Sequence, residues 1–146
     1  MNLAHYFDSS AVLAMLFQQE VASDVLGLWE TSSYRVSSFL TYFECVNVNS
    51  RYCAGLPVVN RQKWGAESSR WIDNAMRSLS LHEVNASVLE RLKRESKLVD
   101  ARTLDAIHLA TALIFQDAGV QVELVTFDER MRKCASQLGL SVLPSK

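Results

Sequence analysis

Three carboxylates stand alone in apolar stretches of the sequence, where a charge is costly. Asp8 is the only charged side chain in the first 19 residues if His5 is neutral, Glu44 the only one in the stretch 36–50, and Asp105 the only one in 103–116. An ionised carboxylate that is buried without a partner costs several kcal/mol. These stretches contain no lysine or arginine, so a bound cation is the partner that would compensate several acids at once.

A fourth acid, Asp128, joins this set through its place after an apolar segment. Asp8 and Asp128 each follow such a segment and open a helix. In a parallel sheet this places both at the carboxyl ends of strands, where α/β folds bind ligands. Asp105 lies in the first turn of a predicted helix, and Glu44 about one and a half turns into another. Carboxylates gathered there would repel one another unless a divalent metal lay among them, and hard oxygen ligands suit Mg²⁺ or Mn²⁺.

Each acid also has a purely structural interpretation. Asp8 and Asp128 could simply be N-caps of the helices that follow them. Asp105 could complement a helix dipole from the first turn. Glu44, in mid-helix among apolar neighbours, is explained by neither effect and would have to face outward from a partly exposed helix.

Hydrophobic periodicity predicts strands that alternate with helices along the chain. The predicted strands are 3–7, 34–37, 78–82, 122–127 and 141–143, and the predicted helices are 11–17, 22–29, 39–53, 61–77, 86–96, 104–118 and 128–138. Gly55 and Pro57 are expected to end the third helix, and Gly119 the sixth. Asn60 is the expected N-cap of the fourth helix. This alternation is typical of an α/β sandwich with a mainly parallel sheet.

Length and composition limit the classes of protein that fit. The 146 residues suit one domain, residues 1–146, and 49% of them are hydrophobic. No apolar run approaches the roughly 20 residues of a membrane span, and the N-terminus shows no export signal. The three cysteines match no zinc spacing and indicate reduced thiols, hence a cytoplasmic protein. The net charge of −1 gives no global attraction for nucleic acid, so an RNA partner must be argued from a local site.

Four segments, in order, resemble a known family. YFDSSA at 6–11, SSFLTYFE at 37–44, RTLDAIHLATA at 102–112 and VTFDERM at 125–131 are similar to the acid-bearing segments of PIN domains. The third is the most specific and resembles PIN toxins of the VapBC type nearly residue for residue. The segment from Leu56 to Leu81 shows no feature of the family.

The resemblance implies a three-layer α/β/α sandwich with a five-stranded parallel sheet, and a homodimer. It implies an endoribonuclease that depends on Mg²⁺ or Mn²⁺ and is the toxin of a type II toxin–antitoxin pair, with an antitoxin protein as its partner. By position, Asp8, Glu44, Asp105 and Asp128 would be the catalytic and metal-binding residues, with Ser10 and Thr126 supporting them. Glu129 is adjacent to Asp128, so either could complete the site.

Two further residues bear on this site. His108 lies three residues after Asp105 and could be a metal ligand, although a core histidine with one hydrogen bond is the simpler interpretation. Arg102 precedes Asp105 and could reach the mouth of the site to contact RNA. The rest of its basic run, Arg91, Lys93, Arg94 and Lys97, is interspersed with acids and fits a solvated helix face.

Two other functions remain open from the residues alone. One is a PIN scaffold that binds RNA or a protein without cutting, against which the complete set of acids argues. The other is a Mg²⁺-dependent phosphatase-like α/β domain with Asp8 as nucleophile. That class wants a second aspartate two residues later, where this chain has Ser10.

Overall fold

A computed structural model describes residues 2–145, and these contain a sheet of five strands that all run parallel. The strands are β1 (Leu3–Phe7), β2 (Arg35–Ser38), β3 (Ser80–His82), β4 (Gln121–Val125) and β5 (Ser141–Leu143), in the spatial order β3-β2-β1-β4-β5. The predicted α/β fold with a five-stranded parallel sheet is therefore confirmed.

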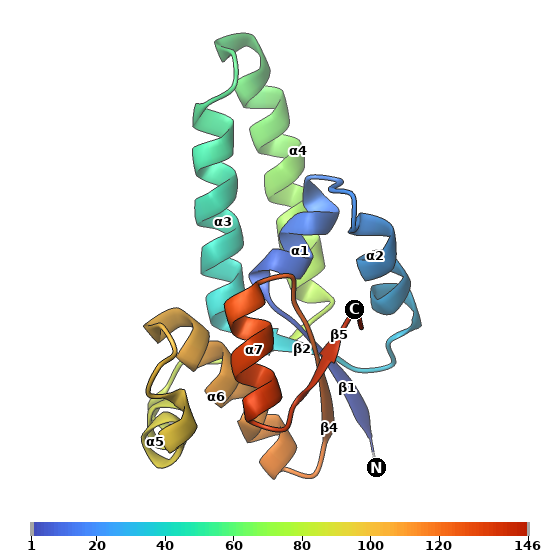
Figure 1. Cartoon of the computed structure of the whole chain (residues 1–146). Coiled ribbons are helices and arrows are strands. Elements are labelled where there is room, and N and C mark those ends of the chain that lie inside the picture. The colour runs from blue at the N-terminus through green and yellow to red at the C-terminus, as the bar shows by residue number, and fades with distance from the viewer. Residues whose placement is uncertain (1, 146) are drawn as a thin grey trace.

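Helices cover both faces of this sheet (Figure 1). They are α1 (Ser9–Leu16), α2 (Ala22–Thr31), α3 (Phe39–Ala54), α4 (Val58–Arg77), α5 (Ala86–Arg94), α6 (Thr103–Asp117) and α7 (Glu129–Gln137), with a 3₁₀ turn, η1, at Ser96–Leu98. One core lies between the sheet and α5, α6 and α7, and the other between the sheet and α1 to α4. The three layers that the resemblance implied are present.

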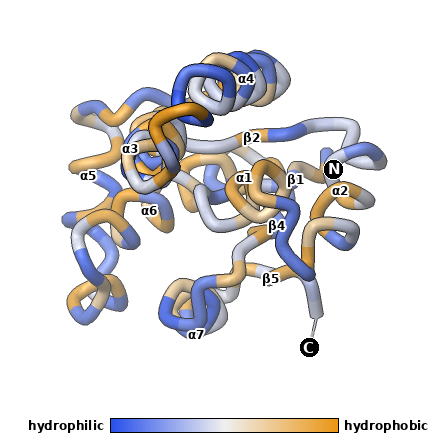
Figure 2. The backbone as a smooth tube through the Cα atoms, turned by 90° about the horizontal axis from the view of Figure 1, so that it is seen from above, coloured by the Kyte–Doolittle hydropathy of each residue, from blue (hydrophilic) through white to orange (hydrophobic). Residues whose placement is uncertain are grey.

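The alternation of side chains along the strands explains why both faces need a cover. Tyr6 points into the core under α6, and Phe7, the next residue, points into the core under α1, and both are fully buried. Leu124 and Val125 repeat this division one strand away. In Figure 2, the residues of α1 are coloured mainly as hydrophobic and those of α7 mainly as hydrophilic.

The strand order sets the position of the site. From β1 the chain builds outward through β2 to β3, then returns to place β4 on the other side of β1. The direction of winding therefore changes between β1 and β4, and a crevice forms at the carboxyl ends of strands on either side of such a switch point. Phe7 and Val125, the last residues of these two strands, are partners in register. Asp8 and Thr126 follow them directly.

Several predicted helix boundaries were wrong by two or three residues, among them the start of the first helix and the end of the second. The fourth helix begins at Val58 with Pro57 as its N-cap, and not after Asn60. Pro57 has φ −53°, which suits a helix start, and its carbonyl already accepts the Asn60 N–H, so Asn60 lies inside the first turn. The fifth helix ends at Arg94, and the chain then tightens into η1.

The segment without a family feature supplies the second helix of a helical hairpin. Leu56–Leu81 contains α4 and leads into β3, and α4 packs against α3 to make the long projection seen in Figure 1. Within residues 2–145, no helix combines the length and the apolar character needed to cross a bilayer.

Candidate functional site

Asp8 is fixed at the end of β1 by three donors. Its Oδ1 accepts the Ser10 hydroxyl at 2.6 Å and the Ala11 N–H at 3.0 Å, and its Oδ2 accepts the Thr126 hydroxyl. The Ala11 bond caps α1, so the N-cap interpretation of Asp8 is confirmed. Ser10 and Thr126 also join the two strand ends, because Ser10 accepts the Phe127 N–H at 3.0 Å. The two hydroxyls predicted to support the acids thus both contact Asp8.

Burial works against the charge of Asp8. The side chain is 3% exposed, and desolvation raises the pKa of its carboxyl, while the bonds from Ser10 and Thr126 hold that pKa back. A carboxylate can accept about four hydrogen bonds, and the three donors leave capacity for one more ligand.

Glu44 is held by a chain of two hydrogen bonds that begins in the core. The Tyr6 hydroxyl lies 2.7 Å from Nδ1 of His108, and Nε2 of His108 lies 2.5 Å from Oε1 of Glu44. Because a carboxylate only accepts, Nε2–H is the donor to Glu44, and in the neutral ring Nδ1 accepts the Tyr6 proton. His108 is 2% exposed. It is therefore a core histidine, as expected, but with two bonds instead of one, and its second partner is a predicted site residue.

Asp105 and Asp128 approach the same edge from α6 and α7. Desolvation raises the pKa of Asp105, and the nearby charges of Asp128 and Glu44 add to this, while His108 and Arg102 oppose it. Asp128 is exposed and caps α7 by accepting the Met131 N–H at 3.1 Å, so its N-cap interpretation is also confirmed. Asp105 therefore lies within electrostatic reach of two of the other three predicted acids.

The four acids gather at one edge without yet forming a ligand cage. Burial raises the pKa of the Tyr6 and Cys45 side chains, and the charges of Glu44 and Asp8 add to this for both groups, so these two acids share an environment as well. Within residues 2–145, however, no three Asp, Glu, His or Cys side chains lie close enough together to share a metal ion as they stand. The chemistry of the donors fits Mg²⁺ or Mn²⁺, and binding requires side chains to turn inward.

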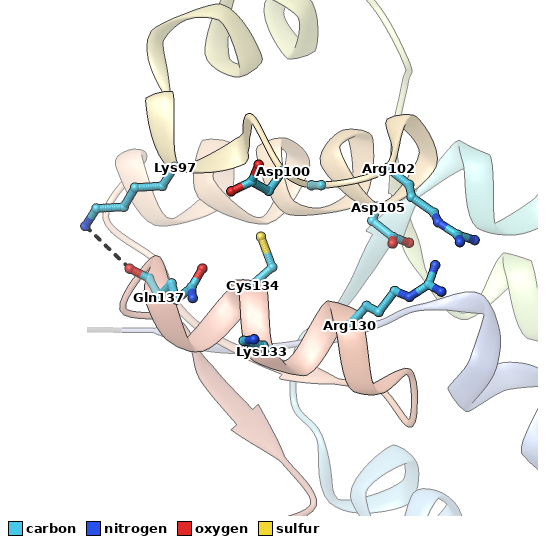
Figure 3. Close-up of a pocket in the computed structure, with 9 residues that line it drawn as sticks. Lys97, Asp100, Arg102, Asp105, Arg130, Lys133, Cys134 and Gln137 are labelled. Carbon is cyan, nitrogen blue, oxygen red and sulfur yellow. Dashed lines mark hydrogen bonds between the residues drawn. The ribbon is translucent and has the colours of Figure 1, made fainter.

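Two depressions of different character flank the acids. Asp105 lines a polar cleft of about 400 Å³ between α7 and the segment from η1 to α6, to which Lys97, Arg102, Arg130 and Lys133 also contribute (Figure 3). Glu44 lines an apolar groove of about 750 Å³ over α3, with Phe43, Val46 and Leu104 among its lining residues. The two depressions meet at adjacent residues, because Leu104 lines the apolar groove and Asp105 lines the polar cleft.

Sequence reasoning missed Tyr6, Arg130 and Lys133. Residues 130, 133, 134 and 137 follow helical spacing on one side of α7, a signal that could have marked a cleft wall. The basic run before Arg102 is divided by the fold. Lys93 is exposed and pairs with Glu90 at 3.6 Å, as expected for a solvated helix, whereas Arg91 is largely buried in its pair with Asp117 at 2.7 Å, and Lys97 and Arg102 line the cleft.

Comparison with known proteins gives the family. The PIN domain model matches residues 5–136. Two ribonucleases of Mycobacterium tuberculosis, VapC46 and VapC35, are each 32% identical to the chain, over 96% and 94% of both lengths respectively. These matches favour a ribonuclease over the phosphatase-like alternative.

Solved structures agree on the fold. A toxin–antitoxin complex from Klebsiella pneumoniae aligns with a TM-score of 0.59 at 19% identity, covering 85% of this chain and 86% of the other. VapBC-1 from nontypeable Haemophilus influenzae aligns with a TM-score of 0.61 at 12% identity, covering 96% of each. With a family model over most of its length and full-length relatives above 30% identity, this chain belongs to the PIN-domain family, among the VapC-type ribonuclease toxins.

Proposed function

We propose that Asp8, Glu44, Asp105 and Asp128 bind Mg²⁺ or Mn²⁺ and that the chain uses this site to hydrolyse internal phosphodiester bonds of RNA. The observation that carries the proposal is the gathering of these acids around the switch point between β1 and β4, where the charges of Asp128 and Glu44 add to burial in raising the pKa of Asp105. Acids that repel one another at a ligand-binding edge are stabilised by a divalent cation.

The acids differ in how they would hold a metal. Asp8 is the fixed member, because three donors orient it. Glu44 has one oxygen on His108 and leaves the other available. Asp105 accepts no hydrogen bond from any residue in the described part of the chain, so it is free to turn toward its neighbours. Asp128 is the proposed fourth member, because its charge adds to the effect of burial in raising the pKa of Asp105.

A bound divalent metal supplies an activated water and offsets the charge that develops on the scissile phosphate. The protein's own part is to orient the carboxylates and to keep other nucleophiles away. His108 is buried with both ring nitrogens engaged, so it is not placed to deprotonate a 2′-hydroxyl of RNA. Attack by water then leaves a 5′-phosphate and a 3′-hydroxyl.

The relatives support a biological setting for this activity. We propose that the chain acts in the cytoplasm as a homodimeric toxin and that an antitoxin protein binds and neutralises it. This rests on the relatives named VapC and on the two toxin–antitoxin structures that share its fold.

Growth of a host cell tests this function. Induced expression of the wild-type chain alone is expected to stop growth and to produce RNA fragments with 5′-phosphate ends, which can be ligated to an adapter without prior phosphorylation. Asp105→Asn is expected to allow normal growth at equal protein levels, since it removes one metal-binding charge. If the two proteins slowed growth equally, toxicity would not come from the acid site.

A further inference from the structure

The polar cleft beside Asp105 carries more positive than negative side chains, in contrast to the chain as a whole. Its lining includes Lys97, Arg102, Arg130 and Lys133 against the carboxylates of Asp100 and Asp105, while the net charge of the protein is −1. No salt bridge involves any of these four cations within residues 2–145. The cleft is thus a local positive field next to the site.

The four cations come from two walls that face each other. Lys97 and Arg102 lie on the segment from η1 to the start of α6, and Arg130 and Lys133 on α7. Figure 3 shows the side chains of Arg102 and Arg130 extending on either side of Asp105, with Lys97 at the other end, where it donates to the Gln137 carbonyl at 3.4 Å. Cys134 lies between the walls and adds no fixed charge.

We infer that this cleft binds the sugar–phosphate backbone of the RNA strand on one side of the scissile bond, an inference that rests on the proposed function. A strand whose phosphate reaches Asp105 leaves the site over one of its two flanks. The groove at Glu44 is lined mainly by apolar side chains such as Phe43 and Val46, which offer a phosphate nothing. The cleft instead offers the guanidinium groups of Arg102 and Arg130, each of which can bind two oxygens of one phosphate. It also offers the ammonium groups of two lysines.

Phosphate contacts set affinity and its salt dependence more than they set sequence choice. The four cations in the cleft are therefore expected to govern how tightly RNA is held, with little influence on the chemical step. The inference concerns RNA and not an acidic segment of a partner protein, because the cleft opens directly onto an acid of the site where RNA is cut.

The test measures how tightly a labelled single-stranded RNA of mixed sequence binds to the protein. All variants carry Asp8→Asn, which silences cleavage. Binding is measured in millimolar Mg²⁺ over a series of salt concentrations. Adding Arg130→Ala and Lys133→Ala should weaken binding about tenfold at low salt and lower the slope of log affinity against log salt by about 1.4, or about 0.7 for each phosphate that the protein no longer neutralises. Lys97→Ala, on the opposite wall, should lower the slope by about 0.7.

The matched control is Lys63→Ala with Arg70→Ala, one lysine and one arginine exposed on α4. This pair should leave affinity and slope unchanged. The inference is overturned if the cleft variants and the control pair bind RNA equally, or if the cleft variants lose affinity with no change in slope. Because binding is measured without cleavage, this outcome is separate from failure of the proposed function, which would appear as an unchanged cleavage rate in the acid variants.

Discussion

Asp8→Asn is expected to lower the rate of RNA cleavage about 100-fold or more and to leave the protein folded. The loss follows because the fixed member of the acid set no longer carries charge, and charge stabilisation of a transition state contributes effects of this size. The fold should survive because asparagine caps helices as well as aspartate, and its carbonyl can still accept the Ala11 N–H. The Ser10 hydroxyl can still donate to that carbonyl oxygen, and the Thr126 hydroxyl can turn to accept from the new amide NH₂ group.

Asp24→Asn is the matched control, since Asp24 is likewise an aspartate at the start of a helix, in the first turn of α2, and lies outside the site. It should cleave RNA at the wild-type rate. Cleavage by both proteins is measured as the initial rate on the same RNA under saturating metal, with circular dichroism to compare their folds. Wild-type activity in Asp8→Asn would remove Asp8 from the site.

His108→Leu is expected to destabilise the protein and to lower kcat through Glu44. The substitution leaves the buried Tyr6 hydroxyl without its ring partner and frees the Glu44 carboxylate to move. A buried donor left without an acceptor costs about 1–3 kcal/mol. His108→Gln can still donate to Glu44 and should keep measurable cleavage. Urea denaturation and kcat, measured for both variants, check the two effects separately.

A double variant separates the effect of the Tyr6 hydroxyl on stability from the effect of the His108 ring on kcat. In the His108→Leu background, Tyr6→Phe removes the hydroxyl that lost its partner, so the double variant should be more stable than His108→Leu alone. It should not recover kcat, because Glu44 is still unsupported. A double variant less stable than His108→Leu would show that the bond from Tyr6 to His108 is not what the ring contributes.

The features that could be predicted from the sequence are those that depend on a residue's position along the chain. Asp8 and Asp128 could be placed at one edge because each ends an apolar segment, and the ends of parallel strands meet at the same edge. The isolation of Glu44 among apolar residues indicated that it needs a partner. That partner is His108, 64 residues later, and no local pattern links the two.

What could not be predicted depends on packing between distant elements. The strand order determines that β1 and β4 are neighbours, and periodicity carries no information on order. Helical spacing could place Arg130 and Lys133 on one side of α7, but their place opposite Lys97 and Arg102 results from how α7 packs near η1 and α6. The predicted N-cap at Asn60 was wrong because Pro57, three residues earlier, already starts the helix.

The measurement that tests the metal site most directly is thermal unfolding of wild type and Asp105→Asn in chelator, Mg²⁺ and Mn²⁺. Burial, together with Asp128 and Glu44, raises the pKa of Asp105, so the ionised group costs stability above that raised pKa, and the cost fades as the pH falls through it. At neutral pH in chelator, Asp105→Asn should therefore melt at or above the wild-type temperature.

Metal should reverse this order. A cation at 100 times its Kd adds about 2.7 kcal/mol to the folded state, which for a domain of this size raises the melting temperature by about 8 °C. The wild type should show this rise, with Mn²⁺ effective at lower concentration than Mg²⁺, and Asp105→Asn should gain less. An unchanged wild-type melting temperature at saturating metal, or an equal rise in both proteins, would contradict a metal site built from these carboxylates.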